Sequence, residues 1–218
     1  MSLRTLKEAT AITGSLGSPS KMPGSSYGIS AEGCITGAKL AQIEDSVCFD
    51  CYAMKGHYQQ TSVKKAHVQR EANIEDPRWV PAMTMKLRAE HSPKRKHPLP
   101  PYHRWHDSGD IRSKKHLANI CEVARATPEL KHWIPTRELQ ILMEFIKEGG
   151  EIPDNLTVRV SATMVDGPAT KAWPTVSHVH QHEAPKGEVC PAPLQDNFCG
   201  ACRKCWDKSV PSVSYHKH

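Results

Sequence analysis

The segment "YHRWHDSGDIRSKKHLANICEVARATPELKHWIPTR", residues 102–137, decides the fold class, because two strand-like stretches in it flank one helical pattern. Its first eight and last seven residues predict strands. Between them Ser113 can cap a helix that ends near Thr127. The apolar face of that helix consists of Leu117, Ile120, Cys121 and Ala124. We therefore expect strand, helix and strand, with Cys121 in the core.

The same alternation continues along the chain. Leu139, Leu142, Met143 and Ile146 fall at helical spacing, and Gly149 ends that helix. "NLTVRVSAT", residues 155–163, is the clearest strand pattern in the sequence. Alternating strands and helices imply right-handed crossovers and a parallel sheet. The sequence predicts an α/β fold, either a partial (β/α) barrel or an open parallel sheet.

The flanking regions differ in composition. Residues 14–30 are rich in Gly, Ser and Pro and predict irregular structure or a loose strand, whereas helices are expected over 62–74 and from Asp76 onward. The tail from Thr175 is rich in His, Pro and Cys, and does not continue the strand and helix pattern. We expect residues 1–174 to form an α/β core with a cysteine loop at 34–51, and residues 175–218 to form a metal-binding extension packed on it.

Charge and cysteine content restrict the class of protein. The net charge is +6, and the densest basic run, "HSPKRKHPLPPYHR" at 91–104, fits a nucleic-acid partner or a solvated loop. No run approaches the roughly 18 apolar residues of a membrane span, and no signal peptide is evident, so we expect a cytoplasmic protein without a membrane partner. The eight cysteines then favour metal over disulfides.

Polar residues follow each of the three expected strands, as "HDSGD" at 106–110, "PTRE" at 135–138 and "SATMVDG" at 161–167. Ligands of parallel sheets bind at the carboxyl ends of strands, so these loops predict the floor of a site. The candidate catalytic residues are His106, Asp107, Asp110 and Arg137. Asp110 could instead cap the following helix, and the fork of Arg137 could clamp a carboxylate or phosphate.

The cysteines form two sets. In the tail, Cys190 is followed by Cys199, Cys202 and Cys205, and this triple two-residue spacing favours a closed iron–sulfur site. A zinc site of the last three with His216 or His218 is the alternative. Near the N-terminus, Cys34, Cys48 and Cys51 have no obvious fourth ligand. A cluster held by three cysteines leaves one iron open to a substrate or cofactor.

The order "CFDC", with Phe49 inside the second cysteine pair, resembles the cluster loop of the radical S-adenosylmethionine superfamily. The resemblance implies a partial TIM-type barrel, a 4Fe-4S cluster on Cys34, Cys48 and Cys51, an electron donor, and S-adenosylmethionine as cofactor. Ser108, Gly109 and Asp110 stand where that superfamily binds the cofactor's amino group. On this interpretation Asp110, Ser161 and Arg137 complete the cofactor's cradle, and its reductive cleavage starts hydrogen abstraction from a substrate.

A resemblance over nearly the full length is to the poorly characterised phage gene-product-88 family, which implies expression in an infected host cell. It is carried by "KMPGSSYGISA" at 21–31, "CYAMKG" at 51–56, "WHDSGD" at 105–110, "WIPTRE" at 133–138, "LTVRVSA" at 156–162 and "CRKCWDKSVPSVSYHKH" at 202–218.

Two other readings remain open. "DSGD" at 107–110, "PTR" at 135–137 and the late cysteines resemble tRNA-guanine transglycosylases in the same order. That resemblance implies base exchange inserting 7-deazaguanine into DNA, with Asp107 or Asp110 as nucleophile or base and a structural zinc. The third reading is a non-catalytic nucleic-acid-binding protein stabilised by zinc.

Overall fold

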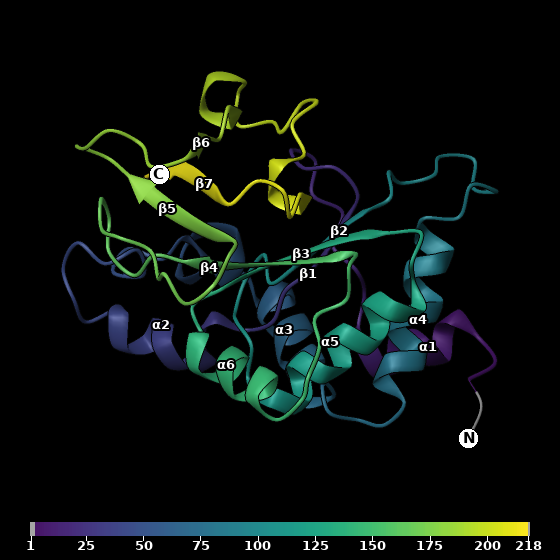
Figure 1. Cartoon of the computed structure of the whole chain (residues 1–218). Coiled ribbons are helices and arrows are strands. Elements are labelled where there is room, and N and C mark those ends of the chain that lie inside the picture. The colour runs from purple at the N-terminus through teal and green to yellow at the C-terminus, as the bar shows by residue number, and fades with distance from the viewer. Residues whose placement is uncertain (1–2, 218) are drawn as a thin grey trace.

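The computed structural model describes residues 3–217 and contains one seven-stranded parallel sheet in the order β1-β2-β3-β4-β5-β7-β6 (Figure 1). All neighbouring strands pair in parallel, and β1 and β6 are the two edge strands and do not pair with each other, so the sheet is open and does not close into a barrel. This confirms the expected α/β class in its open-sheet form. The strands are β1 (Ser25–Tyr27), β2 (Tyr102–Trp105), β3 (Lys131–Thr136), β4 (Leu156–Ser161), β5 (Val176–His180), β6 (Glu188–Val189) and β7 (Ser212–His216).

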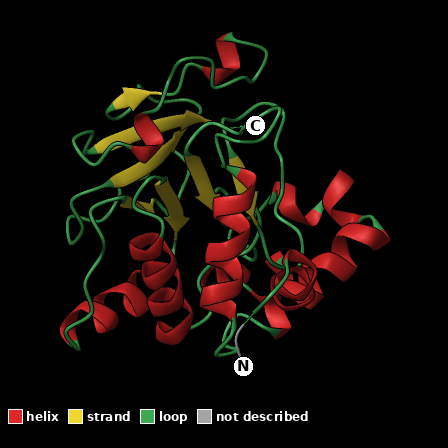
Figure 2. Cartoon of the chain, turned by 90° about the vertical axis from the view of Figure 1, so that its right-hand side faces the viewer, coloured by secondary structure: helices red, strands yellow, loops and turns green. Residues whose placement is uncertain are grey.

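The α-helices gather on one side of the sheet, below it in Figure 1, and Figure 2 shows the same separation of helices and strands. They are α1 (Leu6–Thr13), α2 (Ile35–Leu40), α3 (Thr61–Ala72), α4 (Trp79–Glu90), α5 (Lys114–Ala126) and α6 (Leu139–Lys147). Helix α5 begins as expected, because Ser113 Oγ accepts a hydrogen bond from the backbone N–H of His116 at 3.0 Å. Within residues 3–217 no helix combines the length and apolar character needed to cross a membrane.

The structure contains helix α1, which we did not predict from the sequence, although its first turn carries the sequence pattern of a capping box. The Thr5 side chain accepts from the Glu8 backbone, and the Glu8 side chain accepts from the Thr5 backbone. Helix α4 begins at Trp79, three residues after Asp76 and later than expected. Asp76 accepts from the backbone N–H of Arg78 at 2.8 Å and so supports the turn before the helix.

The hydrophobic core lies between the helices and the sheet. Tyr27, Trp79 and Trp105 are fully buried there, with ring centroids 5.9 to 6.0 Å apart. Cys121 has no exposed surface, as expected for a core residue. The residues just after β1, β2, β3 and β4 are thereby held at one edge of the sheet, because each strand is fixed by the helix packed beneath it.

The tail differs from our expectation, because it extends the sheet itself. Val160 of β4 pairs with Val176 of β5, and β5 pairs with β7 over five residues. The boundary at residues 174 and 175 therefore does not separate two sheets. The alternating "VSHVH" of β5 is a strand pattern, and the histidines and prolines around it concealed that pattern in the composition.

Arg159 fixes the rest of the tail to the open face of the sheet. Its side chain is fully buried and donates hydrogen bonds to backbone carbonyls around the 3₁₀ turn η5 (Lys204–Trp206). The acceptors are Lys204 at 2.6 Å, Cys205 at 3.1 Å, Asp207 at 2.8 Å and Val210 at 2.9 Å. Trp206 packs edge-on against Tyr102 and Trp133, so the tail covers the face opposite the helices.

Candidate functional site

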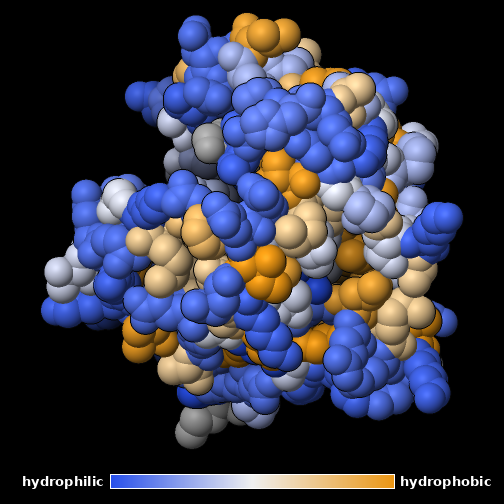
Figure 3. All heavy atoms as spheres, turned by 90° about the vertical axis from the view of Figure 1, so that its left-hand side faces the viewer, coloured by the Kyte–Doolittle hydropathy of each residue, from blue (hydrophilic) through white to orange (hydrophobic). Residues whose placement is uncertain are grey.

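A cavity of about 770 Å³ lies at the carboxyl ends of the strands, between the cysteine loop and the tail. Figure 3 looks onto this side of the molecule, where apolar side chains border a hollow near the centre of the face. The wall combines residues that are far apart in sequence. They include Cys34, Cys48, Cys51 and Tyr52 of the loop, Arg104 of β2, His106, Ser108, Gly109 and Asp110 after β2, Trp133 of β3, Arg137 after β3, Ser161 of β4, and Tyr215 and His216 of β7.

The loop between β1 and α3 brings three cysteines to this wall. A Cβ placed on Gly37 of α2 would lie 3.6 Å from Cys48 Sγ and 3.7 Å from Cys34 Sγ, so both sulfurs flank the same point. Burial raises the pKa of Cys34 to about 11, and Asp110 and Cys51 add to the rise. Burial also raises the pKa of Cys48, to which Cys51 contributes. The structure therefore brings together the three residues expected to form the open site.

These raised pKa values have a chemical meaning. Buried thiols beside one another and beside a carboxyl group become thiolates only when a cation compensates their charge. Within residues 3–217, however, no group of three or more His, Cys, Asp or Glu side chains is compact enough to hold a metal ion.

The segment after β2 is shaped by Gly109 and Asp110. Gly109 has a φ of 79°, and a Cβ there would lie 2.9 Å from the Ile29 carbonyl oxygen, so the turn requires glycine. Asp110 is buried and accepts hydrogen bonds from Thr136 Oγ1 at 2.6 Å and from the backbone N–H of Arg137 at 2.8 Å. Burial raises its pKa to about 6 while these bonds oppose the rise. Asp110 thus joins the ends of β2 and β3, and the alternative that it caps α5 is wrong.

His106 faces the cavity in an unusual state. Its φ is 52°, it is 3% exposed, and neither ring nitrogen has a hydrogen-bond partner within residues 3–217. Burial lowers its pKa well below the usual range, and the charges of His116 and Arg112 add to this effect. The imidazole is therefore neutral, and its ring offers one hydrogen-bond donor and one acceptor at the cavity wall.

The other expected site residues separate into two groups. Ser108, Arg137 and Ser161 line the cavity. Asp107 does not, because its carboxylate turns to Ser26 Oγ at 3.1 Å while its carbonyl accepts from the Tyr52 hydroxyl at 2.6 Å. It therefore supports the wall from behind.

The tail cysteines form a second group beside the cavity. Cys205 Sγ lies 3.1 Å from the Tyr215 hydroxyl, and Tyr215 lines the cavity. Burial raises the pKa of Cys205 to about 12 and that of Cys199, on which Cys190 and Cys202 also act. Cys190 is the shared neighbour, because it adds to the pKa rise of both Cys199 and Cys205. Of the two histidines considered as zinc ligands, His216 lines the cavity described above and packs against His180. His218 lies outside the described residues.

Two wall residues are not among the site residues expected from the sequence. Arg104 of β2 and Trp133 of β3 are register partners on the open face of the sheet. Their alternation with the buried His103, Trp105 and His132 was a usable signal, since side chains two apart share a face.

The fold and site define an α/β protein with an open parallel sheet and a cysteine-lined cavity at its carboxyl edge. The family model described as Gene product 88 matches residues 6–208, so the chain belongs to the Gene product 88 family. This confirms the resemblance to the phage family. Comparisons with curated proteins and with solved structures found no match.

Proposed function

We propose that this protein is a phage-encoded iron–sulfur enzyme of the radical S-adenosylmethionine type, which modifies a nucleic acid or nucleotide in the cytoplasm of the infected cell. The observation that carries the proposal is the convergence of Cys34, Cys48 and Cys51 on one cavity at the carboxyl ends of a parallel sheet. Three thiolates leave a fourth position of a 4Fe-4S cluster open for a ligand.

The order of parts along the chain adds support. The cysteine loop follows β1, and "SGD" at 108–110 follows β2, beside the three cysteines. Ser108, Gly109, Asp110 and Ser161 would hold S-adenosylmethionine, with Arg137 facing its carboxylate. Once bound, cluster and cofactor would supply a radical able to abstract hydrogen, given an electron donor. The neutral His106 would offer the substrate a hydrogen-bond donor and an acceptor.

The tail would hold a second, closed cluster through Cys190, Cys199, Cys202 and Cys205, with zinc as the alternative metal. Its chemical support is that burial raises the pKa of Cys190, Cys199 and Cys205, and that the neighbouring thiols add to each rise. A metal there would tie the segments of the tail cysteines together, including Cys205, which contacts Tyr215 on the cavity wall.

The base-exchange alternative is less well supported. Its nucleophile would be Asp107 or Asp110, yet the Asp107 carboxylate turns away from the cavity toward Ser26. Both oxygens of Asp110 already accept hydrogen bonds, which lowers their nucleophilicity. A non-catalytic zinc protein would not need a cavity with a free histidine and two arginines on its wall.

The test is anaerobic purification followed by measurement of iron, sulfide and zinc per chain, and by EPR spectra with and without S-adenosylmethionine. We expect iron and sulfide in similar amounts and a spectrum that changes with the cofactor. Cys48→Ser should lose the iron of the open site and the response to cofactor. Cys121→Ala is the matched control, because Cys121 is buried in the core and should not affect iron. Zinc without iron in the wild-type protein would refute the proposal.

A further inference from the structure

Arg104 is held rigidly on the cavity wall. Its guanidinium carbon lies 4.8 Å from the centre of the Trp133 ring, and Trp133 in turn packs edge-on against Trp206 at 5.1 Å. Stacking of this kind orients the planar fork of an arginine and leaves its edge free to bind. Arg104 is therefore prepared to present its N–H groups to a ligand.

Its hydrogen-bonding capacity is largely unused within residues 3–217. The one side-chain hydrogen bond of Arg104 is a long contact of 3.4 Å to the Tyr52 hydroxyl, and its Nε is buried without a partner. Asp107 acts on it electrostatically but makes no ion pair with it. Arg112, by contrast, has a carboxylate partner within the protein, because its Nε donates to Glu71 at 2.7 Å. A buried guanidinium without a counter-anion is costly, so an anion from outside would stabilise it.

The surroundings indicate what carries that anion. The cavity of about 770 Å³ has the size of small-molecule sites and cannot accept a duplex. Tyr52, which is half exposed, and Tyr58 lie beside Arg104 on the wall and offer aromatic faces for a base. A guanidinium fork matches two oxygens of a phosphate.

We propose that Arg104 binds the phosphate of a nucleotide whose base stacks on the Tyr52 side of the cavity. The nucleotide is either free or part of a single strand, and both sources share this phosphate chemistry. The inference rests on the proposed function only in taking this cavity as the substrate site. Its distinct content is that recognition begins at the phosphate and requires neither the open cluster of the loop cysteines nor its cofactor.

The test is calorimetric titration of the anaerobically purified wild-type protein with four deoxynucleoside monophosphates, the matching nucleosides, and a short single-stranded oligonucleotide. We expect the monophosphates or the oligonucleotide to bind at least about tenfold more tightly than the nucleosides, as loss of a charged hydrogen bond implies. Preference between the two phosphate ligands identifies free nucleotide or strand as the source.

Variants separate the cavity from the basic loop. Arg104→Gln should abolish the advantage of the phosphate, and Arg104→Lys should retain part of it. Arg95→Gln removes the same charge from the exposed loop, where Arg95 pairs with Glu90, and should leave binding unchanged. Thermal unfolding checks that each variant is folded. If Arg104→Gln does not fold, the test is whether Arg104→Lys reduces the difference in affinity between nucleotides and nucleosides.

Equal binding of nucleosides and nucleotides, absence of binding, or weakening by Arg95→Gln alone would overturn the inference. The iron content of the same sample is measured in parallel. Phosphate-dependent binding by protein without iron would refute the proposed function while supporting this inference. Iron with a cofactor response but no nucleotide binding would do the reverse.

Discussion

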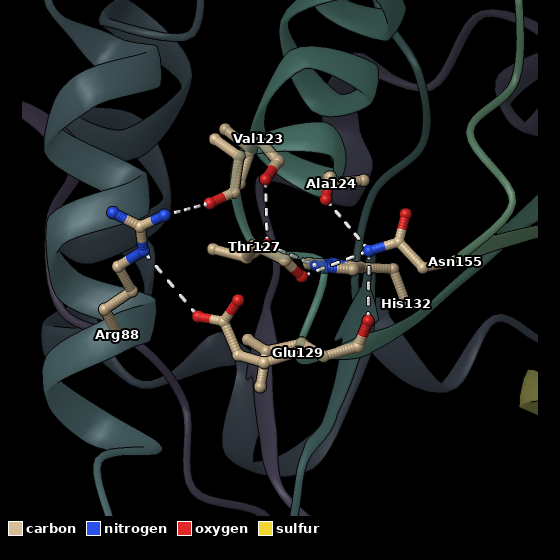
Figure 4. A network of polar contacts seen from close by, with 9 residues as sticks. Arg88, Val123, Ala124, Thr127, Glu129, His132 and Asn155 are labelled. Atoms are coloured by element: carbon tan, nitrogen blue, oxygen red, sulfur yellow. Dashed lines mark hydrogen bonds and ion pairs between the residues drawn. The ribbon is translucent and has the colours of Figure 1, made fainter.

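His132 should make the protein sensitive to mild acid. It is fully buried in a network under the sheet, where its Nε2 lies 2.9 Å from Thr127 Oγ1 and its Nδ1 has no partner among residues 3–217 (Figure 4). Burial lowers its pKa to about 3. His116, also fully buried, has its pKa lowered to about 3 by burial and by the charge of Arg112. Both rings are neutral in the folded protein.

The direction and size of the effect follow from proton linkage. The unfolded chain binds a proton at each histidine below a pKa of about 6.5, whereas the folded protein does so only near the lowered value. The stabilising contribution is therefore complete above pH 6.5 and declines as the pH falls toward 3. At pH 5 each histidine reduces the free energy of unfolding by about 2 kcal/mol relative to pH 8, and the two together by about 4 kcal/mol.

Urea unfolding followed by circular dichroism at pH 8 and pH 5, with reductant and chelator present, measures this loss. His132→Asn isolates one histidine, because the change between the two pH values does not depend on the variant's own stability. We expect the variant to lose about 2 kcal/mol less than the wild type. His97→Asn, at an exposed position, is the control. An equal loss in His132→Asn and wild type would show that His132 can be protonated in the folded protein, and would refute the reasoning.

Three further substitutions test the packing that builds the cavity. Arg159→Met should reduce the free energy of unfolding by at least about 3 kcal/mol, because several buried carbonyls lose their hydrogen-bond donor. Urea unfolding measures this loss, and an unchanged free energy would mean that contacts other than those of Arg159 hold the tail on the sheet. Trp206→Ala should cost about 3–5 kcal/mol in the same assay, and a smaller loss would show that the tail packs loosely on the sheet. Gly149→Ala should cost about 1–2 kcal/mol through its positive φ alone, since nothing lies near its Cβ, whereas Gly109→Ala should cost more because its Cβ meets Ile29. Equal melting temperatures for the two glycine variants would contradict the crowded turn after β2.

Local patterns in the sequence were sufficient to predict the central units of the fold. The cap at Ser113, the apolar face of α5 and the alternation of β4 are each determined within a few residues, so the structure agrees there. β5 and β7 were missed because two short strands rich in His and Ser gain their stability from neighbours in the sheet and not from their own composition.

The candidate site shows a similar division. The rule that parallel strands present ligands at their carboxyl ends was enough to place Asp110, Arg137 and Ser161 on one wall. It could not show that the Asp107 carboxylate points away from the cavity toward Ser26, because side chains at the end of a strand point toward both faces of the sheet. Nor could it find the pair of Arg104 and Trp133, since their contact depends on the register between β2 and β3.

The tail links the two cysteine groups in a way that the division at residue 175 concealed. Tyr215 touches Cys205 through its hydroxyl and also lines the cavity, while the turn that bears Cys205 is tied to β4 by Arg159. Trp206, which follows Cys205 directly, packs against Trp133, and the guanidinium of Arg104 stacks on that same ring. On the proposed function, loss of a metal from the tail should therefore weaken the proposed nucleotide binding even with the loop cysteines intact, because the tail supports the ring on which the guanidinium is oriented.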